Sequence, residues 1–482
     1  MKFSINQFNL RVLFVFTAIL LNSCSKDSDD PTPQETTITV STADFAKSMD
    51  ENPTTGQVIG TILGSTNEGS VTFSIIEQTP SGAFSIDAAS GELKVADESL
   101  FDFETNPTIT GTIKVANGLA VKNALVTITL NDLVEENIYN GDVILRSQQE
   151  VDDFGANNYT QINGFLIIGK LENEGYSDIT DLTPLHSLKH IENYFYIHYN
   201  ENLTTTSGID SLVYIGQSLA IYENPSIVNL NNLNNIENLS NFLYVSDNPS
   251  LSNFDGLKNI TSLGGGLFIR KNNRMANLDW LSNLTSIGDF LTLSANPLIT
   301  NVNGLSNLTN IGGGLIIDGN DSLINLSGFQ NLTGTITALS IGLNNSLISI
   351  NGLSNISVTI GGLNISNNPL LENINALLNT TSIGGSVYIS NNDSLIDLNG
   401  LSNLTSIGFE LDIRRNDNLT SLNGLNNLLY VTSTISITEN TILSDFCDLQ
   451  NLFINGQSAY YRVFSNAYNP SKQDIIDGNC SL

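Results

Sequence analysis

Basic residues are scarce in this chain. Its 482 residues contain 18 Lys and Arg against 48 Asp and Glu, which gives a formal net charge of −30. A protein that binds nucleic acid needs a basic surface to neutralise phosphates, so this balance argues against nucleic acid as a partner. High solubility, cation binding or a neutral ligand such as a glycan are compatible with it.

Residues that usually carry chemistry are also few. The chain has three histidines and three cysteines, and it contains no Gly-x-Ser-x-Gly elbow, no Walker loop and no His-Glu pair of the zinc-enzyme type. We therefore expect no catalytic residues and a protein that is not an enzyme. Two cysteines, Cys447 and Cys480, bracket the C-terminal segment. In an exported protein this pair predicts one disulfide, and two free thiols are the alternative.

One apolar run, Val12–Leu21, follows Lys2 and Arg11 and is too short to cross a bilayer. This arrangement predicts a signal peptide over residues 1–23. The run ends in Leu21-Asn22-Ser23-Cys24, which resembles the lipobox of bacterial lipoproteins. The resemblance implies a lipid on the Cys24 thiol that holds the protein at a membrane. An ordinary secretory signal followed by a chance cysteine is the alternative.

Residues 24–35 form a polar, acidic segment with two prolines that has nothing to bury. We expect it to be a tether. Its beginning resembles the acidic tag that directs lipoproteins to the outer face of the outer membrane in some Gram-negative bacteria. The resemblance implies a lipid anchor in the outer membrane and exposure on the cell surface.

Residues 36–135 predict a β-sandwich, because short runs of alternating polarity are separated by turn residues. The expected strands are Thr37–Val40, Gln57–Ile62, Val71–Ile76, Glu92–Val95, Ile109–Val115 and Ala124–Leu130.

This module resembles a cadherin repeat. The resemblance rests on Asp50-Glu51-Asn52-Pro53, Phe101-Asp102-Phe103-Glu104 and Asn131-Asp132. In that family, acidic motifs at one end of the domain bind Ca²⁺, which prefers six to eight oxygen ligands. The implied ligands are Glu51, Asp102, Glu104, Asn131 and Asp132. Asn117 stands where the family has Asp, and a spacer domain with solvated carboxylates is the alternative.

The rest of the chain is dominated by asparagines at a fixed interval of 24 residues: Asn200, Asn224, Asn248, Asn272, Asn296, Asn320, Asn344, Asn368, Asn392, Asn416 and Asn440. Such a register predicts identical coils stacked in a solenoid. The side chain of each Asn is expected to bond to the bent backbone and to the Asn one coil away. A structural ladder is the expected role, with a ligand-binding ladder as the alternative.

Each repeat holds three short apolar stretches, which we expect to be parallel strands. The repeat resembles leucine-rich repeats and, more closely, the receptor L-domain type. This likeness implies a right-handed β-helix. The predicted fold class is all-β, with a cadherin-like β-sandwich followed by a right-handed parallel β-solenoid of 24-residue coils. Its parts are an N-terminal cap and linker (140–165), the solenoid (166–446) and a C-terminal cap (447–482). A Ser-x-x-Glu pattern at Ser147 predicts a short helix in the first cap.

Outward positions of the first strand carry aromatic residues in the early coils and small polar residues in most later ones. Strand alternation places Leu267 and Ile269 inside and Phe268 and Arg270 outside. An exposed aromatic strip on a polar protein is a candidate ligand face. The alternative is that these aromatics only suit strands, or are covered by the cap or the first module. The strip consists of Tyr194, Tyr196, Tyr222, Phe242, Tyr244, Phe268 and Arg270.

These features together predict a surface lipoprotein that recognises a protein or a glycan without catalysis, as in adhesion. Two other functions stay open. One is a glycan-capturing accessory of a polysaccharide-uptake system, and the other is a β-helix enzyme that acts on carbohydrates. An enzyme of that kind is expected to interrupt the repeat with inserted loops, and the register shows no insertion after the first coil.

Overall fold

The computed structural model describes residues 36–133, 136–359 and 361–482. Its contacts divide the chain into two units, with the division at residues 134 and 135. The expected signal peptide (1–23), the tether (24–35) and the Cys24 lipidation site lie outside the described residues. Among the described residues, no helix is both long and apolar enough to cross a membrane.

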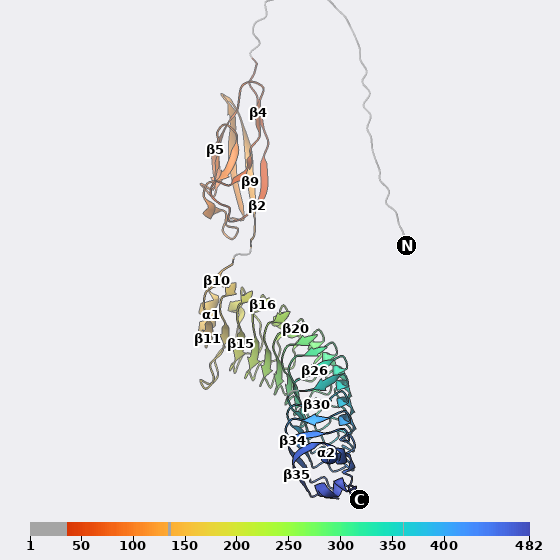
Figure 1. The fold of residues 1–482 in the computed structure, drawn as a ribbon. Helices are drawn as coiled ribbons and strands as arrows, with labels where there is room; N and C mark the ends of the chain where they lie inside the picture. The colour runs from red at the N-terminus through yellow and green to blue at the C-terminus, as the bar shows by residue number, and fades with distance from the viewer. Residues whose placement is uncertain (1–35, 134–135, 360) are drawn as a thin grey trace, which may run out of the picture. The chain divides into compact units, whose positions relative to one another are not determined.

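The first unit is a β-sandwich (Figure 1). One sheet has the strand order β2-β9-β8-β5, a second has the order β3-β7-β6, and β1 pairs with β4. Alternation in β8 sends Ile109, Ile113 and Val115 into the core and leaves Thr110 and Lys114 outside. The bounds are β1 Val40–Thr42, β2 Phe45–Asp50, β3 Val58–Thr61, β4 Gly64–Thr66, β5 Thr72–Thr79, β6 Phe84–Ile86, β7 Glu92–Val95, the 3-10 turn η1 Glu98–Leu100, β8 Thr108–Asn117 and β9 Ala120–Asn131.

The expected strand at Thr37–Val40 is wrong. The first strand starts at Val40, and the backbone before it bonds to a side chain instead of to another strand. The Asn67 Oδ1 accepts from the Thr39 N–H at 2.8 Å, and the Asn67 Nδ2 donates to the Thr37 carbonyl at 3.0 Å. One amide therefore satisfies the groups that a strand partner would have used.

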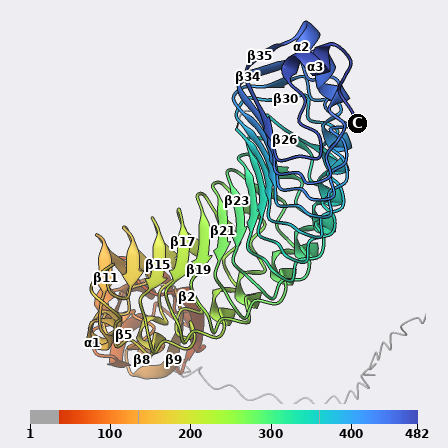
Figure 2. The ribbon, with the colours of Figure 1, turned by 90° about the horizontal axis from the view of Figure 1, so that it is seen from below.

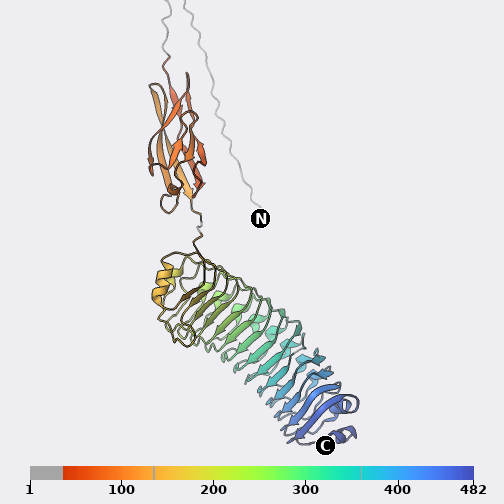
Figure 3. The same cartoon turned by 60° about the vertical axis from the view of Figure 1, so that its left-hand side comes forward.

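The second unit is a solenoid whose successive coils stack along one axis (Figure 3). Its long sheet has 16 strands, of which β30 (Ser382–Ile383) and β32 (Ser406–Ile407) join it through β34 and the other 14 form one face. On this face, the strands from β11 to β23 lie on the inner side of the solenoid's bend (Figure 2). The strands of this face are β11 Val143–Leu145, β13 Leu166–Ile168, β15 Phe195–His198, β17 Leu219–Tyr222, β19 Leu243–Ser246, β21 Leu267–Arg270, β23 Leu291–Ser294, β25 Leu315–Asp318, β27 Leu339–Gly342, β29 Leu363–Ser366, β31 Val387–Ser390, β33 Leu411–Arg414, β34 Tyr430–Thr438 and β35 Gln457–Phe464.

A second, shorter strand follows the turn region in most coils. These strands also pair in parallel with the equivalent strand of the neighbouring coil. They are β10 Ile138–Tyr139, β12 Gln161–Ile162, β14 His190–Ile191, β16 Tyr214–Ile215, β18 Asn238–Leu239, β20 Ser262–Leu263, β22 Ser286–Ile287, β24 Asn310–Ile311, β26 Gly334–Ile336, β28 Ile356–Val358, β30 Ser382–Ile383 and β32 Ser406–Ile407.

The expectation of three strands per coil is wrong, because the middle apolar stretch is a 3-10 turn. In this turn the Leu257 N–H donates to the Phe254 carbonyl at 2.9 Å, which follows the i to i+3 pattern of a 3-10 helix. The turns are η2 Thr183–Leu185, η3 Asn231–Leu233, η4 Asp255–Leu257, η5 Asp279–Leu281, η6 Asn303–Leu305, η7 Ser327–Phe329, η8 Asn351–Leu353, η9 Asn375–Leu377, η10 Asn399–Leu401 and η11 Cys447–Leu449.

Close contact between coils explains the glycine that recurs in this turn. A Cβ at Gly256 would lie 1.6 Å from the Leu230 carbonyl oxygen of the preceding coil. Any larger residue therefore requires the two coils to adjust. Trp280 takes the place of this glycine in the next coil, and its indole stacks on Phe254 with ring centroids 5.3 Å apart.

Both ends of the solenoid carry caps. Helix α1 (Gln148–Gly155) begins at Ser147, whose hydroxyl accepts from the Glu150 N–H at 3.3 Å, as the sequence pattern predicted. Helices α2 (Gln450–Asn455) and α3 (Lys472–Ile476) lie at the other end. The expected disulfide between Cys447 and Cys480 is confirmed. The long sheet extends past the expected solenoid bounds of 166–446, through β11 at one end and β35 at the other.

Candidate ligand groove and candidate cation site

The aromatic strip lies on the long sheet, in rows set by the strand register. Tyr196, Ala220, Tyr244 and Phe268 are direct neighbours on β15, β17, β19 and β21. Because side chains alternate along a strand, Leu267 and Ile269 are fully buried while Phe268 is partly exposed and Arg270 is exposed. The register therefore brings side chains from four coils onto one outward surface.

This surface is hollowed into a groove of about 460 Å³. We call it the aromatic groove. Its lining includes every residue of the predicted strip except Tyr194, and it adds one residue that sequence reasoning missed, Ala220. The signal for Ala220 was present, since an alanine interrupts a row of aromatics at positions 24 residues apart. The lining residues are Tyr196, Ala220, Tyr222, Phe242, Tyr244, Phe268 and Arg270.

Rings of the groove contact one another and extend into a wider aromatic belt. Tyr196 contacts Phe242 with centroids 6.3 Å apart, and Tyr222 contacts Tyr244 edge-on at 5.7 Å. Tyr194 lies beside the groove and stacks on Tyr196 at 4.5 Å. Such contacts add to the packing of the rings, so the walls of the groove are preorganised.

One histidine of this face, His198, is buried beneath the belt. Its ring stacks on Tyr222 with centroids 4.7 Å apart, and only 2% of the residue is exposed. Its Nδ1 has no hydrogen-bond partner among the described residues. Burial lowers the pKa of His198 to about 4, so the ring is neutral near pH 7 and serves as an aromatic support for Tyr222.

The groove's polar groups are phenols and one cation. Burial raises the pKa of Tyr222 to about 12 and also raises the pKa of Tyr196, so both hydroxyls stay protonated and able to donate. Arg270 is exposed and makes no ion pair with any described residue. Its neighbour Lys271 differs, because its Nζ lies 3.0 Å from an Asp247 carboxylate oxygen.

The asparagine column is fully buried and bonded within the protein. In a typical rung, the Asn320 Nδ2 donates to the Leu293 carbonyl at 2.9 Å, and the Asn320 Oδ1 accepts from the Asn296 N–H at 3.1 Å. The residue before every Asn of the column has a positive φ, as at Glu439 with 59°, so the amide satisfies backbone groups at a sharp bend. These side chains are not available to a ligand.

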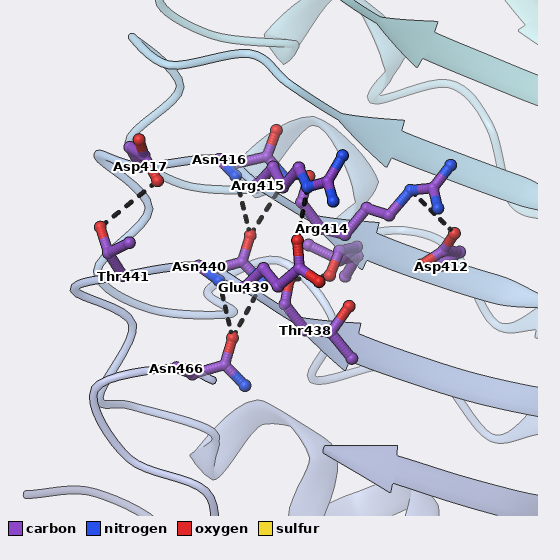
Figure 4. A network of polar contacts seen from close by, with 11 residues as sticks. Asp412, Arg414, Arg415, Asn416, Asp417, Thr438, Glu439, Asn440, Thr441 and Asn466 are labelled. Carbon is purple, nitrogen blue, oxygen red and sulfur yellow. Dashed lines mark hydrogen bonds and ion pairs between the residues drawn. The ribbon is translucent and has the colours of Figure 1, made fainter. Parts of the chain in front are cut away.

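Residues outside the 24-residue column complete the ladder. Ser177 donates to the Asn200 Oδ1 at 2.6 Å at one end, and the Asn440 N–H donates to the Asn466 Oδ1 at 3.0 Å at the other. Figure 4 shows the last rungs, from Asn416 through Asn440 to Asn466. Sequence reasoning missed both ends because their spacing is not 24.

Sequence reasoning also missed a second asparagine column, most of whose residues are exposed. The Asn331 Nδ2, for example, donates to the Ser306 carbonyl of the preceding coil at 2.8 Å. The signal was its own 24-residue period. This column is Asn235, Asn259, Asn283, Asn307, Asn331, Asn355, Asn379, Asn403, Asn427 and Asn451.

In the β-sandwich, three of the five expected cation ligands come together. Carboxylate oxygens of Glu51, Glu104 and Asp132 lie within 4.8 Å of one another. Glu51 is buried and also accepts from the Phe103 and Leu133 N–H groups, each at 2.6 Å. A hydrogen bond from its own backbone lowers the pKa of Glu104, but desolvation and the charges of Glu51 and Asp132 raise it overall.

The other two expected ligands lie outside this cluster of three, although Asp102 also interacts with Glu104. The Asp102 Oδ1 accepts from the Thr105 N–H at 3.0 Å, and this bond lowers the pKa of Asp102. The Asn131 Nδ2 donates to an Asp50 carboxylate oxygen at 2.9 Å. Both side chains therefore stabilise local turns and strand ends in this structure.

No protein-family model matches this chain, and no curated protein matches it either. Among solved structures, it is similar to the human desmocollin-1 ectodomain, the protocadherin gamma B4 extracellular domain and protocadherin gamma B2 cadherin domains 3–6. Each is 17% identical and matches 23% of this chain, with TM-scores of 0.19, 0.18 and 0.17. The match spans 24%, 21% and 31% of those chains, respectively.

Proposed function

We propose that the solenoid is a non-catalytic recognition module that binds a ligand in the aromatic groove. The observation that carries this proposal is the groove itself, which forms where the outward rows depart from an otherwise regular solenoid. Half-buried aromatic rings beside a single charged group are typical of recognition surfaces, where aromatic and Arg side chains supply most of the affinity. The ladder cannot discriminate between ligands because it repeats the same amide in every coil.

Tyr244→Ala tests this proposal. The ring lines the groove, and its loss is expected to weaken ligand binding at least tenfold because a large apolar contact is removed. The matched control is Tyr388→Ala, which lies in the same row six coils further on, outside the groove, at a residue that is 37% exposed. Binding of the mature chain to a glycan array and to cell surfaces is measured for both variants. Equal binding by the two variants would contradict the proposal that the ligand binds in the aromatic groove.

The groove also favours a second function, a glycan-capturing accessory of a polysaccharide-uptake system. The tyrosine rings of the groove support this second function, because aromatic faces stack on sugar rings and phenols form hydrogen bonds to sugar hydroxyls. Binding of polysaccharide without release of reducing ends separates capture from a β-helix enzyme, which is the third function. Release of reducing ends would favour the enzyme.

We further propose that the mature protein is a surface lipoprotein of the outer membrane, anchored through Cys24 and used in adhesion. The lipobox-like sequence and the acidic tether support this location, and the repeat's likeness to receptor L-domains supports a recognition role. In a Cys24→Ser variant we expect the chain to move from the membrane fraction to the soluble fraction. A variant that stays in the membrane fraction contradicts the anchor.

The β-sandwich is proposed to bind Ca²⁺ through Glu51, Glu104 and Asp132. The donor set fits, since Ca²⁺ takes carboxylate oxygens and these carboxylates lie close enough to share one ion. Repulsion among them, which contributes to the raised pKa of Glu104, is relieved by a divalent cation.

Millimolar Ca²⁺ is therefore expected to raise the melting temperature of this unit by several degrees, because it binds only the folded state. The gain should shrink as the pH falls and protons occupy Glu104. Glu104→Gln should abolish the gain, while Glu98→Gln, an exposed acid that bonds Thr55 instead, should keep it. If Ca²⁺ neither shifts the melting temperature of the unaltered protein nor gives a heat of binding, the β-sandwich is a spacer domain with solvated carboxylates.

A further inference from the structure

We propose that the aromatic groove binds a pyranose ring that carries a carboxylate, as in a polysaccharide built from uronic acids. This inference rests on the proposed recognition function and specifies its ligand class. Three features carry it: the gap above Ala220, the open phenol groups around that gap, and the free guanidinium of Arg270.

The gap above Ala220 is a shallow hollow between aromatic rings. Tyr196 and Tyr244 lie one coil before and one coil after Ala220 in the same row, so their backbones are about 9.6 Å apart, twice the interstrand spacing. Ala220 itself is only 2% exposed, and Tyr196 contacts Phe242, two coils further on, with ring centroids 6.3 Å apart. The hollow therefore suits a sugar ring that rests one face on the aromatic rings, and a tyrosine in place of Ala220 would fill it.

The rim of the gap offers hydrogen-bonding groups at the edge of such a ring. The hydroxyls of Tyr196, Tyr222 and Tyr244 make no hydrogen bond to other described residues. Each can donate one hydrogen bond and accept others. A pyranose presents apolar C–H faces and an edge of hydroxyls, so it matches both the aromatic walls and the polar rim.

The charge of the ligand follows from a comparison of two arginines. Arg270 and Arg414 occupy the same row six coils apart. In the preceding coil of each, a tyrosine (Tyr244 or Tyr388) pairs with the residue two positions before the Arg. Beside Arg414 stands Asp412, and the Arg414 Nε lies 3.5 Å from its carboxylate. Beside Arg270 the equivalent residue is Phe268. Arg270 therefore makes no ion pair with any described residue, whereas Arg414 has a carboxylate in its own strand. The Asp318 carboxylate, two coils further along the row of Arg270, interacts with Arg270 only through its charge. Arg binds planar carboxylates in two-pronged geometry.

A peptide fits the same groove less well. The strands beneath it are already paired on both sides. For example, β17 pairs with β15 and β19, and β21 pairs with β19 and β23. Their backbone N–H and C=O groups are used, so an extended peptide cannot add as a further strand over the groove. A peptide ligand would rely on side-chain contacts alone, and it is retained as an outcome of the test.

The test measures dissociation constants of the mature chain for polygalacturonate, alginate, hyaluronan and glucuronoxylan, each beside its carboxyl-reduced neutral form. We expect at least one acidic polymer to bind, and its neutral form to bind at least tenfold more weakly. Arg270→Gln should weaken the acidic polymer about 10- to 100-fold, the range for losing hydrogen bonds to a charged group, and leave the neutral form unchanged. Arg414→Gln is the matched control and should bind normally.

Ala220→Leu provides a second variant that removes no ligand contact. It fills the gap and should reduce binding at least tenfold, whereas Asn364→Leu, in the same row six coils away, should not. The inference is overturned if none of the four acidic polymers binds, if neutral forms bind equally, or if Arg270→Gln has no effect. If Tyr244→Ala still abolishes cell binding in that case, recognition stands and a protein ligand replaces the sugar. If Tyr244→Ala leaves cell binding unchanged, both the recognition function of the groove and the sugar ligand are rejected.

Discussion

Asn320→Ala is expected to lower the free energy of unfolding of the solenoid by about 2–6 kcal/mol. The change removes the acceptor of the Asn296 N–H and the donor to the Leu293 carbonyl, both in the buried interior. Each buried backbone group left without a partner costs about 1–3 kcal/mol. Denaturant unfolding followed by circular dichroism measures the loss, and hydrogen exchange of the Asn296 amide locates it.

Asn331→Ala is the matched control for this variant. It lies eleven positions further along the sequence, but its amide is exposed and donates a single bond to the Ser306 carbonyl, which water can replace. A loss of about 0.5–1.5 kcal/mol is expected, the usual net worth of one hydrogen bond. If both variants lose the same stability, the ladder has no special role in the fold.

Cys447→Ser is expected to destabilise the C-terminal end by about 2–5 kcal/mol, the usual cost of removing a native disulfide. The bridge joins residues 33 positions apart in the sequence. It holds the tail where the Phe446 N–H donates to the Cys480 carbonyl at 2.8 Å and where Ile475 is fully buried. A lower melting temperature in oxidising buffer is the measured result.

Reducing agent provides the control for this prediction. It should lower the melting temperature of the unaltered protein to that of Cys447→Ser and leave the variant unchanged. An identical melt for variant and unaltered protein in oxidising buffer contradicts a stabilising bridge. Loss confined to the last coils is expected, since stability in repeat proteins is carried by nearest neighbours.

Much of the solenoid could be predicted from the sequence because its repeats are undisturbed. The 24-residue register placed Leu267 and Ile269 inside and Phe268 outside, and both placements match the structure. The 3-10 turn was missed for a physical reason. Its Leu-x-x-Leu stretch is apolar like a strand, and only the packing of Gly256 against the Leu230 carbonyl shows that the chain must bend there.

The groove shows a different limit of sequence reasoning. Its aromatic residues were found because strand alternation directs their side chains outward. The hollow depends on Ala220, which matters because it has no large side chain. The lack of an ion pair at Arg270 likewise depends on Phe268, which stands in the same strand where Asp412 stands beside Arg414. In the β-sandwich, the approach of Glu51 to Glu104 and Asp132 was expected only from a family resemblance. Asp102 bonds to Thr105 in a local turn, and Asn131 bonds to Asp50 because β2 and β9 are paired strands.

The asparagine ladder has a direction. Each Oδ1 accepts from the coil before it, so the ladder makes the same bond at successive boundaries between coils. A whole coil of 24 residues can therefore be duplicated or deleted without changing the register of the ladder. Longer spacings occur at the end of the solenoid, where Asn440 bonds to Asn466 at a separation of 26 residues. The length of the solenoid is thus an evolutionary variable counted in coils, and the groove can be carried nearer to or further from either cap in steps of about 4.8 Å.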